Sequence, residues 1–93
     1  MKRKYENNEI RKAFVEVYER LVIDEKFQNQ NQFAISIGTT HSVVSLILRS
    51  ERKPSISMIE LLIKTYNINA NYLFGTSKKM YRGFHDSAHV NLN

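Results

Sequence analysis

The side chains with the most obvious chemistry in this sequence are cations, and they are clustered. Nine of the fourteen lysines and arginines fall in three groups: Lys2, Arg3 and Lys4; Arg49, Arg52 and Lys53; and Lys78, Lys79 and Arg82. Because residues 5–48 hold four basic and six acidic side chains, the net charge of +5 is concentrated at the two ends and in the central group. This distribution favours an acidic partner. We expect phosphate contacts from the central group, whereas the terminal groups serve either partner binding or solubility alone.

Patterns typical of catalysis or metal binding are weak. His85 and His89 are four residues apart with Asp86 between them, which suits two ligands on one helical face, but no third ligand is evident. The chain has no glycine-rich phosphate loop and no cysteine for a disulfide or a thiolate metal site. We therefore predict no enzyme, no metal site and no cofactor. Four carboxylates are expected on the solvated face of a helix: Glu16, Glu19, Asp24 and Glu25.

The apolar spacing near the start of the chain predicts a long amphipathic helix from Glu9 to about Lys26. A pair of charges, Glu16 and Arg20, is spaced to support its outer face. We expect Phe27 to fill the core between this helix and the next. The apolar stripe consists of Ile10, Ala13, Phe14, Val17 and Leu21, widened by Tyr18, Val22 and Ile23.

A short helix is predicted next. Asn29 can cap its start, and Gln32 stands at the spacing of a capping box. Gly38 stops this helix, because a chain leaves a helix through a left-handed residue most easily where no Cβ is present. Its inner face holds Phe33, Ala34 and Ile37.

A second short helix follows after very few residues. Thr39 or Thr40 can cap it, and Val44 and Ile47 form its inner face. Two helices joined so closely must cross steeply, which requires a small side chain where they touch. Ala34 meets that requirement.

The loop from Arg49 to Pro54 contains the only proline, whose fixed φ suits a turn just ahead of a helix. Ser55 or Ser57 can cap that helix. Its inner stripe is predicted to consist of Ile56, Ile59, Leu62, Ile63 and Tyr66.

The remaining chain predicts one more short helix. Residues 67–69 break the preceding helix, Asn71 can cap a short fifth helix, and Gly75 ends it. A further turn of helix is possible around residues 80–84. No segment alternates as a strand does, so the predicted fold class is all-α with five helices. We divide the chain into a basic, mobile N-terminal arm (1–8), a helical domain (9–75) and a short C-terminal tail (76–93).

Three parts of this pattern resemble the helix-turn-helix domains of the phage-repressor and Cro-like family, also called the xenobiotic-response-element (XRE) family. The first is the pair of short helices around Gly38. The second is the basic loop from Arg49 to Ser55, and the third is the closing segment from Asn69 to Gly75. Three signals in this order and spacing are fairly specific, and they cover about residues 10–75. The resemblance implies a lambda-repressor-like domain that binds double-stranded DNA. The residues of the two short helices that carry the resemblance are Gln30, Phe33, Ala34, Ile37, Gly38, Val44 and Ile47.

The resemblance also implies which residues meet DNA. In such proteins the second helix of the motif enters the major groove, where each base pair shows a distinct hydrogen-bonding pattern, and phosphate contacts hold it in register. Gln30 matches the family's phosphate-contacting glutamine, with capping of its own helix as the alternative. We expect base contacts from His41, Ser42, Val43, Ser45 and Leu46, and phosphate contacts from Gln30, Asn31, Thr40, Arg49, Arg52 and Lys53.

Two features depart from the family. Val43 and Leu46 are apolar where members commonly carry long polar side chains, so they contact thymine methyls or sugars, or else lie under another element or a partner chain. A protein-interaction module using this face is therefore the alternative function. Leu48 replaces a glutamate that often pairs with an arginine, whose place falls here on Val22 or Ile23. Apolar substitution of such a buried pair can be neutral or stabilising, so we expect Leu48 to be mostly buried near one of these residues.

Length and composition limit the remaining options. The chain has 93 residues, 42% hydrophobic and 25% charged, which indicates one soluble domain. No apolar run approaches the roughly 18 residues of a membrane span, and the start of the chain is unlike a signal peptide, so we expect a cytoplasmic protein with no membrane partner. We predict a transcriptional regulator that acts as a homodimer, without a small-molecule ligand. Leu61 and Tyr72 are the candidate dimer contacts, the latter matching an aromatic of the family.

Overall fold

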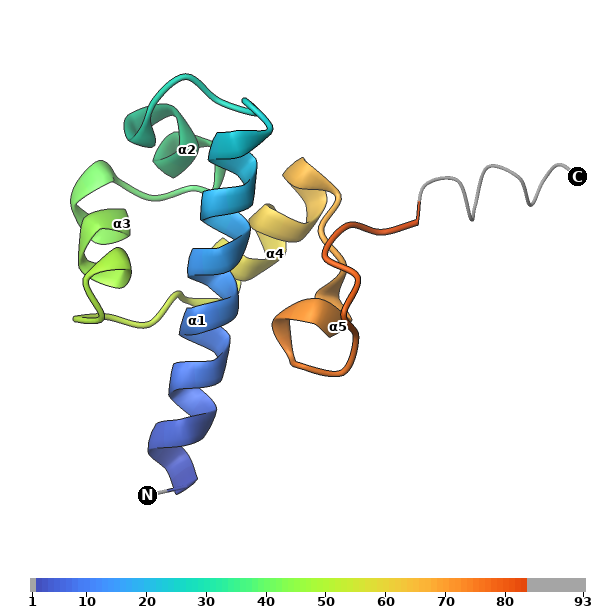
Figure 1. Ribbon diagram of the computed structural model, residues 1–93. Coiled ribbons are helices and arrows are strands. Elements are labelled where there is room, and N and C mark those ends of the chain that lie inside the picture. The colour runs from blue at the N-terminus through green and yellow to red at the C-terminus, as the bar shows by residue number, and fades with distance from the viewer. Residues whose placement is uncertain (1, 84–93) are drawn as a thin grey trace, which may run out of the picture.

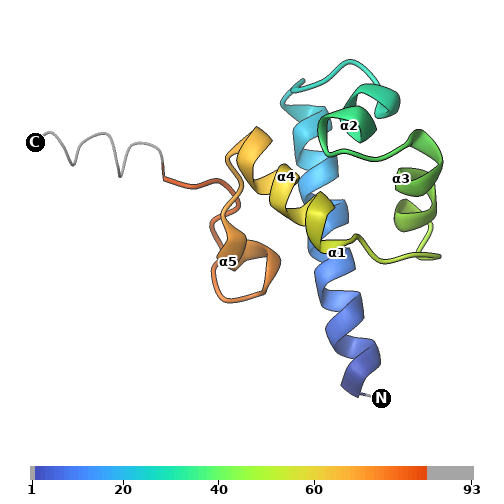
Figure 2. The same ribbon diagram turned by 180° about the vertical axis from the view of Figure 1, so that it is seen from behind.

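The computed structural model describes residues 2–83 of the protein, with the side chains of residues 10–83. This part of the chain is all-helical, as predicted, apart from one isolated antiparallel bridge between Ile68 and Tyr81. Figures 1 and 2 show α1 running through the middle, with α2 and α3 on one side and α5 on the other, and α4 passing behind α1 in Figure 1. The helices are α1 (Lys2–Ile23), α2 (Gln30–Ser36), α3 (His41–Leu48), α4 (Ile56–Tyr66) and α5 (Ala70–Leu73).

The first helix is longer at its start than the sequence pattern indicated. It begins at Lys2, so residues 2–8, predicted to be a mobile arm, form the first two turns of α1. It ends at Ile23 rather than near Lys26. The end is made by Glu25, which adopts a left-handed φ of 57°, and by the amide of Lys26, which bonds the carbonyl of Leu21 at 3.0 Å. The sequence gives no signal for this helix end, because the left-handed position is usually occupied by glycine and here it is a glutamate.

The core forms where α1 meets the pair of short helices. The predicted inner residues of α1, α2 and α3 are buried, and Ile10 and Tyr18 are partly buried. Phe27 fills the predicted place: its ring stacks on Tyr18 at 5.5 Å and lies 5.0 Å from Phe33, centroid to centroid. The expected widening of the α1 stripe is wrong for Val22 and Ile23, which are 46% and 71% exposed.

The fourth helix begins after Ser55, whose hydroxyl accepts from the amide of Met58 at 3.2 Å. Four of its five predicted inner residues are buried or partly buried against the core, and Ile56 is the exception. Met58, Ile59 and Leu62 are buried, while Ile56 is 74% exposed at the first helical position. The helix ends at Asn67, which adopts a left-handed φ of 58°.

The chain after α4 folds back onto the domain. Asn69, not the predicted Asn71, caps α5, and its side-chain amide also donates to the Lys79 carbonyl at 3.0 Å. Further along, the Arg82 amide bonds the Asn67 carbonyl at 2.9 Å, and the Tyr81 hydroxyl donates to Asp24 on α1 at 2.7 Å. Residues 76–83, predicted to belong to a tail, therefore pack on the domain and are held there by these hydrogen bonds.

Residues 80 and 81 are not helical, so the predicted turn of helix is wrong over the part that the structure describes, and residue 84 lies outside it. None of the helices in residues 2–83 combines the length and the apolar character needed to cross a bilayer.

Candidate nucleic-acid interface

The start of α2 is fixed by side-chain capping. The Asn29 carboxamide oxygen accepts from the amide of Gln32 at 2.8 Å, as predicted. The return bond of the capping box is shifted by one residue, because the Gln32 side chain accepts from the amide of Gln28 instead of that of Asn29. The first bond satisfies a donor that a helix start leaves unpaired, and the second ties the residue before the cap to the first turn, so α2 begins at a defined residue.

A tight turn sets the angle between α2 and α3. Gly38 adopts a left-handed φ of 75°, and a Cβ at this position would lie 2.9 Å from Cδ1 of Leu61 on α4. The backbone at this position therefore favours glycine, whereas the contact involves the end of the partly exposed Leu61 side chain, which can shift. Thr40 then caps α3 by accepting from the amide of Val43 at 3.3 Å.

The third helix divides into an inner and an outer face. Val44 and Ile47 are fully buried, as predicted. His41 and Ser42, at the start of the helix, are exposed. The other three predicted base-reading residues, Val43, Ser45 and Leu46, are partly buried, and Val43 packs against the core.

Gln30, the first residue of α2, reaches across to α3. Its side-chain amide donates to the Ser45 hydroxyl at 2.8 Å and lies 3.4 Å from the His41 carbonyl oxygen. Asn29 provides the side-chain cap of α2. Gln30 thus links the start of α2 to α3, a partner that sequence reasoning missed because Ser45 lies fifteen residues further along the chain.

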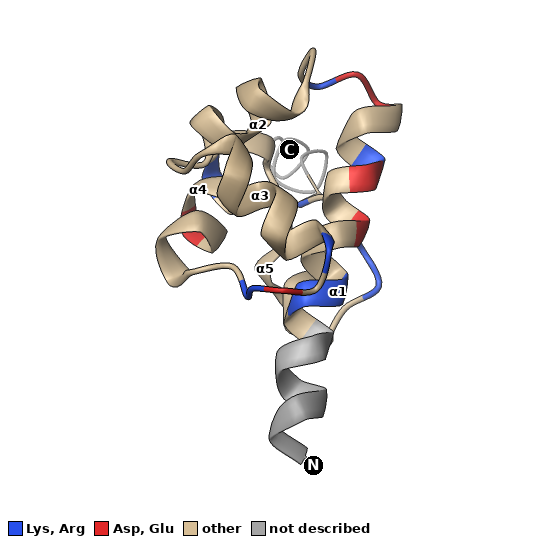
Figure 3. Ribbon diagram, turned by 90° about the vertical axis from the view of Figure 1, so that its left-hand side faces the viewer, with Lys and Arg blue, Asp and Glu red and all other residues tan. Residues whose placement is uncertain are grey.

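The loop after α3 holds the central basic cluster. Ser50 adopts a left-handed φ of 68°, and the amide of Glu51 bonds the Leu46 carbonyl at 2.8 Å, which closes the helix. Arg49 lies 3.4 Å from Glu51 in an exposed ion pair, and Arg52 and Lys53 are exposed. Figure 3 shows this loop beside an uncharged α3, on the side of the molecule facing the viewer.

The other predicted contacts are placed as follows. Asn31 and Thr40 are exposed near the start of α2 and α3. Leu48 is partly buried against the core, but Val22 and Ile23 are exposed, so the expected buried contact with them is wrong. Leu61 is 38% exposed. The third basic cluster falls in the segment after α5, which lies across α1 from α3 (Figure 1).

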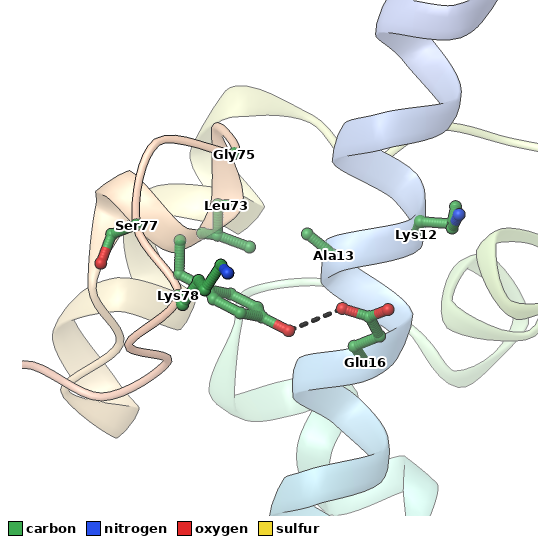
Figure 4. A pocket seen from close by; sticks show the side chains of 8 residues that line it. Lys12, Ala13, Glu16, Leu73, Gly75, Ser77 and Lys78 are labelled. Carbon is green, nitrogen blue, oxygen red and sulfur yellow. Dashed lines mark hydrogen bonds between the residues drawn. The ribbon is translucent and has the colours of Figure 1, made fainter.

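Tyr72, the second candidate dimer contact, packs against α1. Its hydroxyl donates to Glu16 at 2.6 Å, in place of the predicted pairing of Glu16 with Arg20 (Figure 4). Arg20 instead pairs with Asp24 at 3.2 Å. Burial and the neighbouring Glu16 carboxylate raise the pKa of Tyr72 to about 12. A pocket of about 280 Å³ opens here, and Lys12 and Lys78 are among its lining residues.

Metal ligands do not gather in the part of the chain that the structure describes: no group of three histidine, cysteine or acidic side chains is suitably placed there. The predicted pair His85 and His89, with Asp86, lies outside the described residues.

The described residues form an all-helical domain in which two short helices are joined by a tight turn, and the second of them has an exposed start and is followed at its other end by an exposed basic loop. Comparisons with protein-family models, with curated proteins and with solved structures gave no match.

Proposed function

We propose that this protein is a sequence-specific, repressor-like DNA-binding regulator of transcription. In this proposal the domain is lambda-repressor-like and α3 enters the major groove. The observation that carries it is the division of α3: Val44 and Ile47 anchor one face in the core, while His41 and Ser42 stand exposed at the helix start. The N-terminal residues of a recognition helix are those that meet base edges.

The exposed side chains suit the chemistry of the groove. His41 can hydrogen-bond a purine, and Ser42 can donate or accept. The partly buried Leu46 and Val43 offer methyl groups, which fit beside a thymine methyl. Such a surface gives few direct hydrogen bonds, so we expect modest direct readout of the base sequence.

Phosphate-binding groups flank α3 at both ends. Asn31 and Thr40 lie exposed near its start, next to Gln30, whose side-chain amide already donates to Ser45 and His41, while the loop from Arg49 to Lys53 follows its end. Eight helical residues span about 12 Å, which is close to the roughly 12 Å width of the major groove. The two sets are therefore spaced to contact the backbones on opposite sides of one groove.

The ion pair between Arg49 and Glu51 does not block this role. Both side chains are exposed, and surface pairs of this kind contribute roughly 0 to 1 kcal/mol. A DNA phosphate can therefore displace the glutamate at little cost.

The burial of Val43 and Leu46 weighs against the alternative, a protein-interaction module on this face. Val43 is partly covered by the core, and neither side chain is strongly exposed. The face therefore offers a protein partner little apolar area. The proposed regulator acts as a homodimer, because dimers of this class read two half-sites about 34 Å apart.

The test is a titration of duplex DNA at several salt concentrations. Counterion release lowers log affinity against log salt with a slope near 0.9 per phosphate contact. Replacing Arg49, Arg52 and Lys53 together by alanine should reduce that slope by up to about 2.7. The matched control removes three exposed lysines elsewhere, Lys26, Lys64 and Lys78, and should change the slope far less.

Selection of bound sequences from a random duplex pool then measures specificity. His41→Ala and Ser42→Ala should alter the selected sequence while leaving the salt slope in place. A protein that ignores DNA even in dilute buffer, or a loop variant no different from its control, contradicts the proposal.

A further inference from the structure

A pocket of about 280 Å³ lies between α1 and the chain that runs from the end of α5 to residue 78. Part of its wall is apolar and well packed. Ala13 on α1 and Leu73 on α5 are 8% and 1% exposed, and Figure 4 shows their side chains facing each other across the gap. Pockets for drug-sized ligands hold roughly 300–1,000 Å³. This one is slightly smaller, so it fits a small molecule with an apolar part.

Two ammonium groups border the pocket. Lys12 lines it on α1 and Lys78 in the segment after α5, on opposite sides in Figure 4. Both side chains are exposed, and no ion pair within residues 10–83 involves either of them. A hydrated ammonium at the surface holds an anion weakly, but two that border one hollow can contact the same acidic group. The pocket therefore favours a negatively charged ligand.

Ser77 adds a hydroxyl donor to the lining. Its oxygen accepts from the backbone amide of Lys79 at 3.1 Å and from the side-chain amide of Asn69 at 3.3 Å. These two bonds occupy both acceptor positions of the hydroxyl, so its proton remains to be donated. No acceptor among residues 10–83 takes that proton. An anionic group in the pocket supplies one.

Glu16 is the one carboxylate of the described lining. Its Oε1 accepts the proton of the Tyr72 hydroxyl at 2.6 Å, so the protein itself already uses this oxygen. Two ammonium groups and one carboxylate leave the lining with a net charge of +1, which matches a ligand with one negative charge. Glu16 and Tyr72 are 56 residues apart in the chain, which explains why no local pattern indicated a small-molecule ligand.

Other classes of ligand fit this lining less well. A metal cation would find a single carboxylate here and two ammonium groups that repel it. DNA docked on α3, as proposed above, would lie on the other side of α1 from this pocket (Figure 1). Inorganic phosphate would use the charges but leave the apolar wall uncovered. An organic acid uses both the charges and the wall.

We propose that the pocket between α1 and α5 binds a small organic carboxylate. The carboxylate group lies between Lys12 and Lys78 and accepts from Ser77, in charge-assisted bonds that are stronger than neutral ones. The apolar body of the ligand covers Ala13 and Leu73. The proposal stands apart from the proposed function, because it uses no residue assigned there to DNA.

The experiment titrates the full chain with benzoate in low-salt buffer and follows the backbone amides by NMR. Benzamide, which has the same ring without the charge, and inorganic phosphate, which has charge without a ring, are titrated in parallel. Benzoate should shift the amides of Leu73, Gly75 and Ser77 in a saturable manner and leave those of Val44 and Ile47 on α3 in place. Benzamide and phosphate should each bind less tightly than benzoate.

Two substitutions should change the benzoate affinity in opposite directions. Lys78→Gln removes one cation and should weaken binding roughly two- to fivefold, on the scale of an exposed ion pair. Glu16→Gln removes the anion of the lining but keeps an oxygen for the Tyr72 hydroxyl, so it should strengthen binding by a similar factor. Lys64→Gln and Glu19→Gln remove the same charges at exposed positions outside the pocket and are the matched controls.

Circular dichroism checks that every variant keeps its helices. The proposal is overturned if benzoate shifts no amide that borders the pocket, or if benzamide or phosphate shifts the same amides with equal affinity. It is also overturned if Lys78→Gln binds benzoate as tightly as Lys64→Gln does, or if Glu16→Gln binds it no more tightly than Glu19→Gln does. Opposite changes at the two pocket residues, with unchanged controls, support it.

Discussion

The side chains of Gln30 and Ser45 are joined by a hydrogen bond of 2.8 Å that connects the first residue of α2 to the middle of α3. The bond is partly buried and spans the turn at Gly38. It therefore holds the two short helices at a fixed relative position. In the proposed complex it also leaves the Ser45 proton available to donate, because one hydroxyl lone pair already accepts from Gln30.

Removing this bond should lower both stability and DNA affinity. In urea unfolding of Gln30→Ala, Ser45→Ala and the double variant, we expect a coupling free energy of roughly 0.5–1.5 kcal/mol. DNA affinity should fall in either single variant, and little further in the double. Strictly additive losses of stability would show that the two side chains act independently.

Gly38→Ala should destabilise the protein mainly through its backbone, with a smaller contribution from a contact that the end of the Leu61 side chain can relieve. The left-handed backbone costs an L-residue about 1–2 kcal/mol, and the new Cβ would lie 2.9 Å from Cδ1 of Leu61. In Gly38→Ala/Leu61→Ala the contact is relieved but the backbone cost remains, so the double variant should recover only part of the loss. Thermal and urea unfolding, with Leu61→Ala as the control, measure the two parts. Full recovery would mean that the backbone cost is negligible.

The hydrogen bond between Tyr81 and Asp24 should make the stability of the protein depend on pH in the acid range. The hydrogen bond from Tyr81 is the main cause that lowers the pKa of Asp24 below its usual 3.8, with Arg20 adding to it. The stability due to this carboxylate is therefore present above pH 3.8 and lost as the pH falls through the lower folded pKa. In Tyr81→Phe this acid-dependent loss should be smaller. Urea midpoints at pH 6 and pH 3 compare the two proteins.

The hydrogen bond between Tyr81 and Asp24 should also affect the stability of the protein at alkaline pH. Burial, followed by the hydrogen bond to Asp24, raises the pKa of Tyr81 to about 12 from its usual 10.0. Because the folded state holds the proton longer than the unfolded chain, its contribution is present below pH 10 and is lost as the pH rises toward about 12. The wild type should therefore lose more stability than Tyr81→Phe over this range. Equal losses would mean that the folded hydroxyl titrates as it does in the unfolded chain.

Glu51→Gln should strengthen DNA binding. Glu51 pairs with Arg49 at 3.4 Å in the loop proposed to contact phosphate, and its carboxylate repels the same backbone. Removing the charge should raise affinity roughly two- to fivefold, on the scale of an exposed ion pair. Glu19→Gln on α1 removes the same charge from another exposed position and is the control. A fall in affinity for Glu51→Gln would place the loop away from the DNA.

Several details escaped sequence reasoning because they depend on neighbours far along the chain. The spacing of Ile56 fits the inner stripe of α4, and the rest of that stripe faces the core, yet Ile56 is exposed at the first position of the helix while Met58 is buried. Asn69 caps α5 rather than Asn71 because its side chain also bonds residues of the returning segment. Leu48 is partly buried as expected, but its predicted neighbours are solvent-exposed.

The sequence by itself determined the helical fold class, the order and number of the helices within residues 2–83, and the turn at Gly38. These follow from short-range physics: apolar spacing, capping side chains and the φ that only glycine adopts easily act within a few residues. Only the tertiary structure decided that Gln30 bonds Ser45, that Tyr72 and Tyr81 bond carboxylates on α1, and that Lys12 and Lys78 border one pocket. Such contacts join residues far apart in the chain, and their free energy depends on the relative placement of whole helices, which no local pattern encodes.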